Sequence, residues 1–350
     1  MQKDFNSALC HQILFNKVQP KLSYTPDCDF LLWKKAIKEK WTELLGLDEI
    51  AKNACPPRLT IDWEEKKEGY TQTRFTFESE IGETVPCYLL TPDTGKAKYP
   101  VVILLQGHSS GFHLSVGEKK WKEDEAWQPR KSFALQAVKH GFAALAIEQR
   151  GLGERRSKLS YGEENVYYGR PHMCAVAALN AFALGRTILG ERVWDISKAI
   201  DLLPNFPQCD TEKITVAGIS GGGTATFYAG CYDERIKLVV PCCAFSSYKT
   251  SIFAIEHCLC NYIPSVWNWF DMQDLACLVA PRNLLIVTGQ KDEIFPVTGV
   301  RSSYETVKGI YARAGVEDKC RLVETPSGHH WCEDIVWTAI NEECKKLGWK

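Results

Sequence analysis

The segment GISGG at positions 218–222 places a serine, Ser220, among three glycines. The preceding residues ITVA are β-branched or apolar and predict a buried strand, and the small residues that follow predict a closely packed helix. A serine in a sharp turn between a strand and a helix exposes its hydroxyl for attack on a carbonyl carbon. Glycines fit such a turn because Cβ atoms there would collide with the strand and the helix. The sequence therefore predicts that Ser220 is a nucleophile.

The same spacing of glycine and serine occurs a second time, in GHSSG at positions 107–111. That segment also follows an apolar run, but the residues after it, FHLSVGEKKWKEDE, are mostly polar and show no helical apolar stripe. Only positions 218–222 have the full context of strand, turn and helix. Ser220 is therefore preferred to Ser109 as the nucleophile.

A serine hydroxyl needs a base within hydrogen-bond reach, and the base must be oriented by a third group. For a serine on this kind of turn, the acid and then the histidine follow along the chain. Three histidines follow Ser220, and His257 lies before the penultimate predicted strand, which is too early. His329 and His330 follow the last predicted strand. We favour His329, directly after a flexible glycine, and His330 stays the alternative.

The predicted strand at 283–288 ends just before the segment GQKDEIFP. A carboxylate in the first turn beyond a buried strand can accept a hydrogen bond from an imidazole that arrives from the next strand. Asp292 occupies that position, and Glu293 is the alternative acid. The other reading of Asp292 is a turn or capping residue.

A tetrahedral intermediate needs N–H donors for its oxyanion. The N–H group of Gly221, directly after the nucleophile, is one expected donor. The second is expected from the loop after the strand at 100–105, where Gly107 allows a close approach of the backbone and His108 supplies the N–H group. This assigns the second glycine-serine motif a role in binding the oxyanion.

An aromatic segment, CLCNYIPSVWNWFDM at 258–272, lies between two predicted strands. Trp267, Trp269 and Phe270 in it are candidate substrate-binding residues that could stack on a sugar or line an acyl pocket, and a role in plain packing is equally open. The pair Cys258 and Cys260, next to a histidine, is too closely spaced to form a structural zinc site without ligands from elsewhere. We expect no metal and no cofactor, and we expect the 15 cysteines to be reduced thiols.

The composition excludes several classes of partner. The 350 residues include 42 basic and 43 acidic side chains, so there is no charge excess for binding nucleic acid. The N-terminal segment lacks the apolar core of a secretory signal, and no stretch is apolar over the length of a membrane span. We therefore expect a soluble, cytoplasmic protein with a small-molecule substrate and no membrane or nucleic-acid partner.

Strand and helix patterns alternate along most of the chain, which predicts an α/β fold with a mostly parallel central sheet flanked by helices. The carboxyl ends of parallel strands are where such folds bind ligands. The expected helices cover 30–45, 131–140, 191–203, 297–314, 332–346 and part of 172–188; the expected strands cover 73–79 and 85–90 as a hairpin, 100–105, 142–148, 214–217, 236–241, 283–288 and 320–324.

We expect a helical N-terminal extension over residues 1–60 and a catalytic domain over 61–350, with a small cap-like insertion at about 244–272. The helix at 30–45 has apolar residues at helical spacing, and Gly46 is its expected end. The extension could pack against the core or form the contact of a homo-oligomer, and both stay open.

With these residues placed, the chain from about Gly69 to its end resembles the serine-type branch of the α/β-hydrolase superfamily that is similar to dienelactone hydrolases and acetyl xylan esterases. The resemblance rests on YLLTP at 88–92, the loop after 105, RGLG at 150–153, VWD at 193–195, GISGGG at 218–223 and the Pro-Arg pair at 281–282. The chain departs from this branch where a common His-Gly reads Gln-Gly at 106–107, and where the acid before Arg150 is displaced to Glu148.

The resemblance implies hydrolysis of carboxylic esters, often acetyl esters on carbohydrates, by Ser220, Asp292 and His329. We therefore expect a serine ester hydrolase that acts through an acyl-enzyme on short-chain esters, possibly of carbohydrates. The alternatives are a serine peptidase of the prolyl-oligopeptidase type, for which residues 1–60 are too short to form the usual propeller, and a binding module without catalysis.

Overall fold

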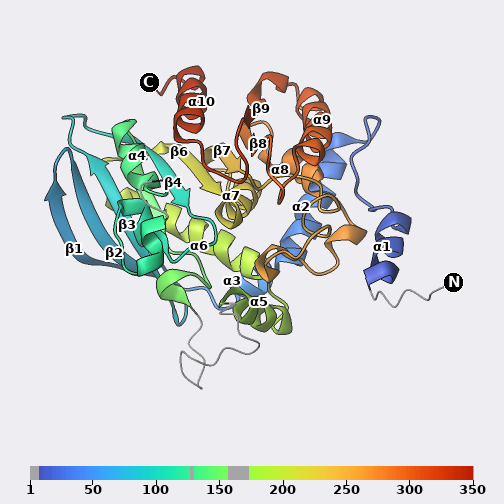
Figure 1. The fold of residues 1–350 in the computed structure, drawn as a ribbon, viewed down its shortest axis with the longest axis horizontal. Helices are drawn as coiled ribbons and strands as arrows, with labels where there is room; N and C mark the ends of the chain where they lie inside the picture. Colours follow the sequence, from blue (N-terminus) through green and yellow to red (C-terminus); the bar gives the residue numbers. More distant parts are fainter. Residues whose placement is uncertain (1–7, 127–129, 157–172, 350) are drawn as a thin grey trace.

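The computed structural model describes residues 8–126, 130–156 and 173–349. In this part of the chain, nine strands form one sheet in the order β1-β2-β3-β5-β4-β6-β7-β8-β9 (Figure 1). The strands are β1 Leu59–Lys67, β2 Tyr70–Glu80, β3 Glu83–Pro92, β4 Tyr99–Leu105, β5 Ala143–Ile147, β6 Cys209–Ile219, β7 Ile236–Cys242, β8 Asn283–Gly289 and β9 Cys320–Thr325. The helices are α1 Ala8–Lys17, α2 Phe30–Leu45, α3 Leu47–Ala51, α4 Phe133–Lys139, α5 Met173–Ala183, α6 Ile188–Leu202, α7 Gly221–Tyr232, α8 Ala276–Val279, α9 Val297–Arg313 and α10 Glu333–Lys346.

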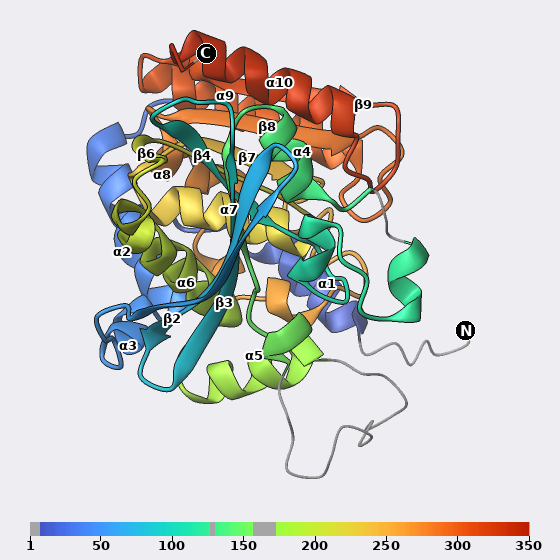
Figure 2. The ribbon, with the colours of Figure 1, turned by 90° about the vertical axis from the view of Figure 1, so that its left-hand side faces the viewer.

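The sheet is antiparallel at one edge and parallel elsewhere. Strands β1, β2 and β3 pair antiparallel, and β3 also pairs antiparallel with β5. From β5 through β4 to β9 every neighbouring pair is parallel. The view from the β1 edge shows the antiparallel strands in front of the parallel ones (Figure 2). The expected α/β fold with a mostly parallel sheet is confirmed.

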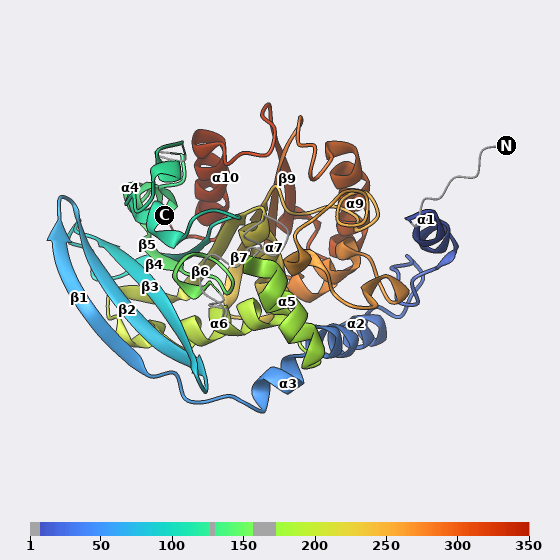
Figure 3. The same ribbon diagram turned by 60° about the horizontal axis from the view of Figure 1, so that its bottom comes forward.

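Helices cover both faces of the sheet, as the alternation of side chains along β4 shows. Val101, Ile103 and Leu105 join a core formed with α2, α6, α7 and α9. Val102 and Leu104 join a second core with α4 and α10 on the other face (Figure 3). All seven residues of β4 are buried, as is typical of a strand covered on both sides.

Helix α2 has the predicted bounds, and its ends follow local rules. Asp29 accepts a hydrogen bond from the Leu32 N–H group, and Gly46 ends the helix with a φ of 71°. The apolar spacing of residues 30–45 predicts that Leu31 and Leu32 belong to the buried face of this helix. That part of the prediction is wrong, because the two side chains are 77% and 66% exposed.

The buried stripe of α2 runs instead through residues spaced by four: Trp33, Ile37, Trp41 and Leu45. The ring of Trp41 packs on that of Tyr228 in α7, with 4.6 Å between the ring centroids. The N-terminal segment is therefore anchored in the same core as the helix that follows Ser220.

Strand β1 is absent from the sequence prediction. It lies at the edge of the sheet, and its residues LTIDWEEKK are exposed or only partly buried, so that charged side chains interrupt any apolar alternation. Since β1 begins at Leu59, the predicted domain boundary between residues 60 and 61 falls after the second residue of this strand. Among the described helices, none combines the length and apolarity that a membrane crossing needs.

Candidate active site

Ser220 lies in a sharp turn between the end of β6 and the start of α7. Its φ of 54° and ψ of −126° put a non-glycine residue in a disfavoured backbone region. The turn is held by hydrogen bonds from the Ser220 N–H group to the Cys242 carbonyl at 3.0 Å and from the Thr224 N–H group to the Ser220 carbonyl at 2.8 Å. The predicted strand, turn and helix around this serine are therefore present.

The glycines of the turn are required by close packing against the end of β4. A Cβ atom on Gly218 would lie 2.7 Å from the Leu105 carbonyl oxygen, and one on Gly222 would lie 2.2 Å from the same oxygen. Real Cβ atoms do not approach that closely, so larger residues would push the turn away from β4. These contacts are the physical reason for the glycines that the sequence shows.

Asp292 lies three residues beyond β8 and is 4% exposed. One carboxylate oxygen accepts hydrogen bonds from the N–H groups of Ile294 and Phe295, at 2.8 and 3.0 Å. The other oxygen accepts a hydrogen bond from Nδ1 of His329 at 2.9 Å. Burial by itself would raise the pKa of Asp292, but these hydrogen bonds outweigh it and hold the pKa below its usual value. The neighbouring Glu293 is exposed.

His329 and His330 differ in what their side chains contact. The His329 imidazole lies against the Phe295 ring, with its Nδ1 on Asp292, and its Nε2 is buried without a hydrogen-bond partner among the described residues. His330 is exposed. With Nδ1 carrying the proton that Asp292 accepts, Nε2 of His329 is left as a proton acceptor.

The three predicted residues follow neighbouring strands at the same edge of the sheet. Ser220 follows β6, Asp292 follows β8 and His329 follows β9. Between them, Cys243 follows β7, and its Sγ lies within 4.8 Å of ligand atoms of both Asp292 and His329. The Ser220 N–H group donates a hydrogen bond to the carbonyl of Cys242, which directly precedes Cys243. The fold therefore brings the segments that follow β6, β8 and β9 to the same region of the sheet edge.

The loop after β4 lies directly against Ser220. A Cβ atom on Gly107 would come within 3.0 Å of both the Ser220 Cβ and the Ile219 carbonyl oxygen. The imidazole of His108 lies over Gly221, where an added Cβ would be 2.8 Å from the ring. Among the described residues, the N–H groups of His108 and Gly221 have no hydrogen-bond partner, as two oxyanion donors would require.

The buried side chains of Gln106 and Gln149 fix this loop, at positions where the sequence departs from the family pattern that it resembles. Gln106 donates to the Glu148 carboxylate at 2.8 Å, and Gln149 donates to the Gln106 carbonyl at 2.6 Å. Burial raises the pKa of Glu148 to about 7. The displaced acid thus still anchors the loop that carries His108.

Ser109, in the second glycine-serine motif, has a different setting from Ser220. It is followed by a short 3₁₀ segment, Phe112–Val116, and its Oγ is buried without a described partner. The difference in context that the sequence indicated between the two serines is confirmed.

His257 lies near this site, which the sequence analysis did not predict. Its pKa is lowered to about 4, first by burial and further by electrostatic interaction with the neighbouring imidazoles of His108 and His329. Its Nε2 lies 3.3 Å from the Ser251 hydroxyl. Only the folding of the segment after β7 brings it here, and nothing in the spacing along the chain indicated it.

Arg150 and Arg155 form buried ion pairs that connect separate parts of the fold. Arg150 forms buried ion pairs with Glu80 at 2.6 Å and with Asp195 at 3.0 Å, and Arg155 reaches Asp195 at 2.8 Å. These charges join the antiparallel edge of the sheet to α6.

The three aromatic candidates for substrate binding pack against the N-terminal segment. Trp267 donates a hydrogen bond to the Phe15 carbonyl at 3.1 Å. The ammonium groups of Lys21 and Lys40 lie over the Trp269 ring. Phe270 is fully buried, and its ring packs against that of Trp41. These contacts are packing contacts, so substrate binding by these residues stays a prediction.

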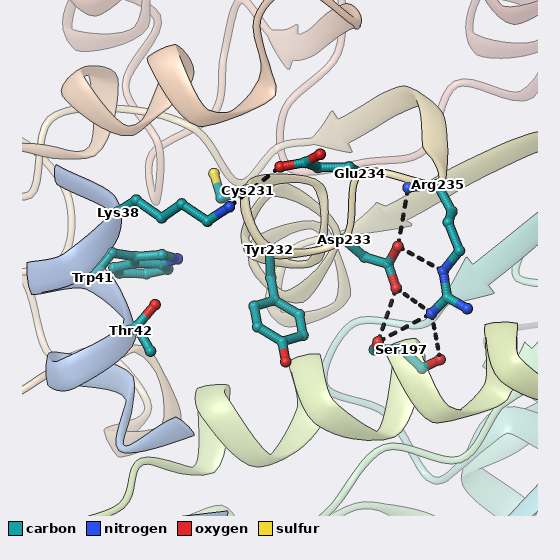
Figure 4. Close-up of a pocket in the computed structure, with 9 residues that line it drawn as sticks. All are labelled: Lys38, Trp41, Thr42, Ser197, Cys231, Tyr232, Asp233, Glu234 and Arg235. Atoms are coloured by element: carbon teal, nitrogen blue, oxygen red, sulfur yellow. Dashed lines mark hydrogen bonds and ion pairs between the residues drawn. The ribbon is translucent and has the colours of Figure 1, made fainter. Parts of the chain in front are cut away.

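A pocket of about 390 Å³ opens at the other end of α7 from Ser220 (Figure 4). It is lined by Lys38, Trp41, Thr42, Ser197, Cys231, Tyr232, Asp233, Glu234 and Arg235. Helix α7 has 12 residues, which separates the pocket from Ser220 by about 18 Å. Its acids are paired with bases, Asp233 with Arg235 at 2.6 Å and Glu234 with Lys38 at 3.2 Å. The Ser197 hydroxyl donates to Asp233 at 2.8 Å, but that carboxylate is already paired with Arg235.

Comparisons with known proteins agree with this fold. A family model described as the Abhydrolase family matches residues 4–243. A Bacillus subtilis (strain 168) protein named "Putative hydrolase YtaP" is 25% identical over 273 residues, which are 77% of this chain and 86% of that protein. A 4-O-methyl-glucuronoyl methylesterase of Phanerochaete carnosa is 24% identical over 223 residues, 56% of this chain and 52% of that protein.

Among solved structures, a Bacteroides fragilis protein described as "a putative acetyl xylan esterase" superposes with a TM-score of 0.76 at 17% identity, covering 99% of this chain and 96% of that one. At this identity the likeness shows the fold, which is the α/β-hydrolase fold that the sequence resemblance predicted.

Proposed function

The chain belongs to the Abhydrolase family, and from that premise we propose that it is a serine carboxylic-ester hydrolase with Ser220, His329 and Asp292 as its catalytic residues. The observation that carries the proposal is that a strained serine turn and an imidazole lie at the same edge of the sheet. Nδ1 of this imidazole is held by Asp292, and no described residue, Ser220 included, forms a hydrogen bond with its Nε2. A serine nucleophile needs both parts.

In the proposed reaction, Nε2 of His329 takes the proton of the Ser220 hydroxyl as its oxygen attacks the ester carbonyl carbon. The N–H groups of Gly221 and His108 donate to the oxyanion that forms. The imidazolium then returns the proton to the leaving alcohol. A water molecule, deprotonated by the same nitrogen, attacks the acyl carbon, and the imidazolium gives that proton to the departing Ser220 oxygen as the acid is released. Asp292 holds the imidazole in orientation and stabilises its charge throughout.

We further propose that the substrates are short esters of carbohydrates. The names of two similar proteins, an acetyl xylan esterase and a glucuronoyl methylesterase, both describe esters in which one side is a one- or two-carbon group. The two classes differ in which side of the ester is the sugar. Rates on an acetylated xylose and on a methyl glucuronate, compared with p-nitrophenyl acetate, would distinguish them.

The test of the serine is covalent labelling. A fluorophosphonate probe should label the protein at Ser220, as located by peptide mass spectrometry, and Ser220→Ala should abolish both labelling and turnover of p-nitrophenyl acetate, by at least about a thousandfold. The matched control is Ser109→Ala, which removes the serine of the other motif and should keep labelling. A binding module would show no labelling, and unchanged turnover by Ser220→Ala would refute the assignment.

A further inference from the structure

Four potential metal ligands from three separate segments meet beside the loop after β4. His108 comes from that loop, Cys174 from the first turn of α5, and Cys258 and Cys260 from the segment around the 3₁₀ turn Leu259–Asn261. Their ligating atoms all lie within 4.8 Å of one another. In the sequence only Cys258 and Cys260 are close together. The fold adds His108 and Cys174 to this pair, which makes four potential ligands.

The distances suit a tetrahedral ion. Cys258 Sγ lies 3.3 Å from Cys260 Sγ, which lies 3.1 Å from Nε2 of His108. Zinc bound to sulfur at about 2.3 Å places neighbouring ligand sulfurs about 3.8 Å apart, so small movements of the side chains would complete the geometry. Three cysteines and one histidine are a common ligand set of structural zinc sites.

Two of the three thiols are enclosed, whereas Cys258 is half-buried and His108 is exposed. Cys260 is fully buried and Cys174 is 4% exposed, and both join a small separate cluster with Leu152, Ala178 and Ile188. Helix α5 packs directly on the turn that carries Cys260. Buried cysteines often serve only as small apolar side chains, so the enclosure alone does not decide between packing and metal binding.

A buried arginine is the second, independent observation. Arg192 is 1% exposed, and its guanidinium donates to the Arg150 carbonyl at 2.7 Å and to the Cys174 Sγ at 3.4 Å. Among the described residues no carboxylate forms an ion pair with it, and its Nη1 has no hydrogen-bond partner. A buried cation needs a compensating negative charge.

We propose that His108, Cys174, Cys258 and Cys260 form a structural zinc site. Three thiolates and a neutral imidazole around one divalent ion carry a net charge of about −1, which Arg192 would balance. With all four positions taken by protein ligands the ion would have no open position for substrate or water. It would tie the loop that carries the His108 N–H group to α5 and to the segment after β7.

The first test is the metal content of the full-length protein, produced without a polyhistidine tag in zinc-supplemented medium and freed of loosely bound metal by gel filtration. Elemental mass spectrometry should find about one zinc ion per chain, falling at least about tenfold in Cys260→Ser and Cys174→Ser. Cys209→Ser is the matched control, because Cys209 is also buried but lies in the main core. Zinc-free wild-type protein, or equal zinc in all variants, would overturn the proposal.

The second test uses only the wild-type protein, so the proposal can still be tested if a variant in the first test fails to fold. After removal of zinc with a chelator, Co²⁺ should restore the visible absorption of a tetrahedral cobalt thiolate. N-ethylmaleimide should modify Cys258 in the metal-free protein and leave it unmodified in the zinc form. Absence of the cobalt spectrum together with equal modification in both forms would refute the site, as would a disulfide among these cysteines in freshly purified protein. None of these readouts depends on esterase activity.

Discussion

The Asp292 carboxylate accepts a hydrogen bond from Nδ1 of His329 at 2.9 Å, although the two residues are 37 positions apart in the chain. The same carboxylate is fixed from its other oxygen by two backbone N–H groups, so its orientation does not depend on the imidazole. This arrangement determines which ring nitrogen of His329 carries the proton, and the activity should depend on it.

Asp292→Asn should lower kcat for p-nitrophenyl acetate by about ten-thousandfold, because the amide keeps the shape but favours the wrong tautomer of the imidazole. Steady-state kinetics of the purified variant measure this. Glu293→Gln is the matched control, since Glu293 is the adjacent acid and is exposed; it should keep near wild-type kcat. Equal losses in both variants would show that the acid has been assigned to the wrong residue.

His329→Ala should abolish turnover by at least about a thousandfold, whereas His330→Ala should retain it. The reason is that only the His329 ring is held by Asp292, while the His330 side chain is exposed. Both variants should be compared by kcat/KM and by their thermal unfolding, so that a loss of fold is not mistaken for a loss of base. An inactive, folded His330→Ala with an active His329→Ala would reverse the assignment.

Gly222→Ala should lower the free energy of unfolding by about 1–3 kcal/mol or more, because its Cβ atom would be 2.2 Å from the Leu105 carbonyl oxygen. Urea unfolding measures the change. The control is Gly309→Ala inside helix α9, where the nearest atom to an added Cβ is the edge of the Tyr24 ring at 3.2 Å and alanine favours the helix. A variant at 222 as stable as the one at 309 would contradict the close packing of the turn.

The free energy of unfolding should fall at acid pH when Asp195, which is buried beside Arg150 and Arg155, becomes protonated. Burial opposes ionisation, but the two guanidinium groups outweigh it and lower its pKa from 3.8 to about 2. Because the pKa of Asp195 is lower in the folded than in the unfolded state, its ionisation stabilises the fold by about 2 kcal/mol above pH 3.8. This contribution is lost as the pH falls from 3.8 through about 2.

Asp195→Asn should therefore flatten the loss of stability between pH 4 and pH 2 and cost about 3–5 kcal/mol at neutral pH, because two buried arginines lose a partner. Chemical denaturation across this pH range measures both effects. Glu49→Gln removes one partner of an exposed ion pair with Lys52 and should change stability by less than about 1 kcal/mol. An unchanged acid profile in Asp195→Asn would mean that other carboxylates control the acid transition.

The sequence by itself determined the elements with strong local signals. The fully apolar β4, the amphipathic spacing of α2 with Gly46 at its end, and the glycines around Ser220 all depend on periodicity or on backbone sterics, which act over a few neighbouring residues. Strand β1 carried no such signal, because an exposed edge strand can be rich in charged residues.

Only the tertiary structure decided which distant side chains meet. It distinguished His329 from His330 by which ring reaches Asp292, placed His257 beside them, and turned Trp267, Trp269 and Phe270 toward the N-terminal segment. It also brought Cys174 and His108 to Cys258 and Cys260. Such contacts depend on strand order and on the paths of loops, which are set by the packing of the whole chain rather than by the residues that make the contact.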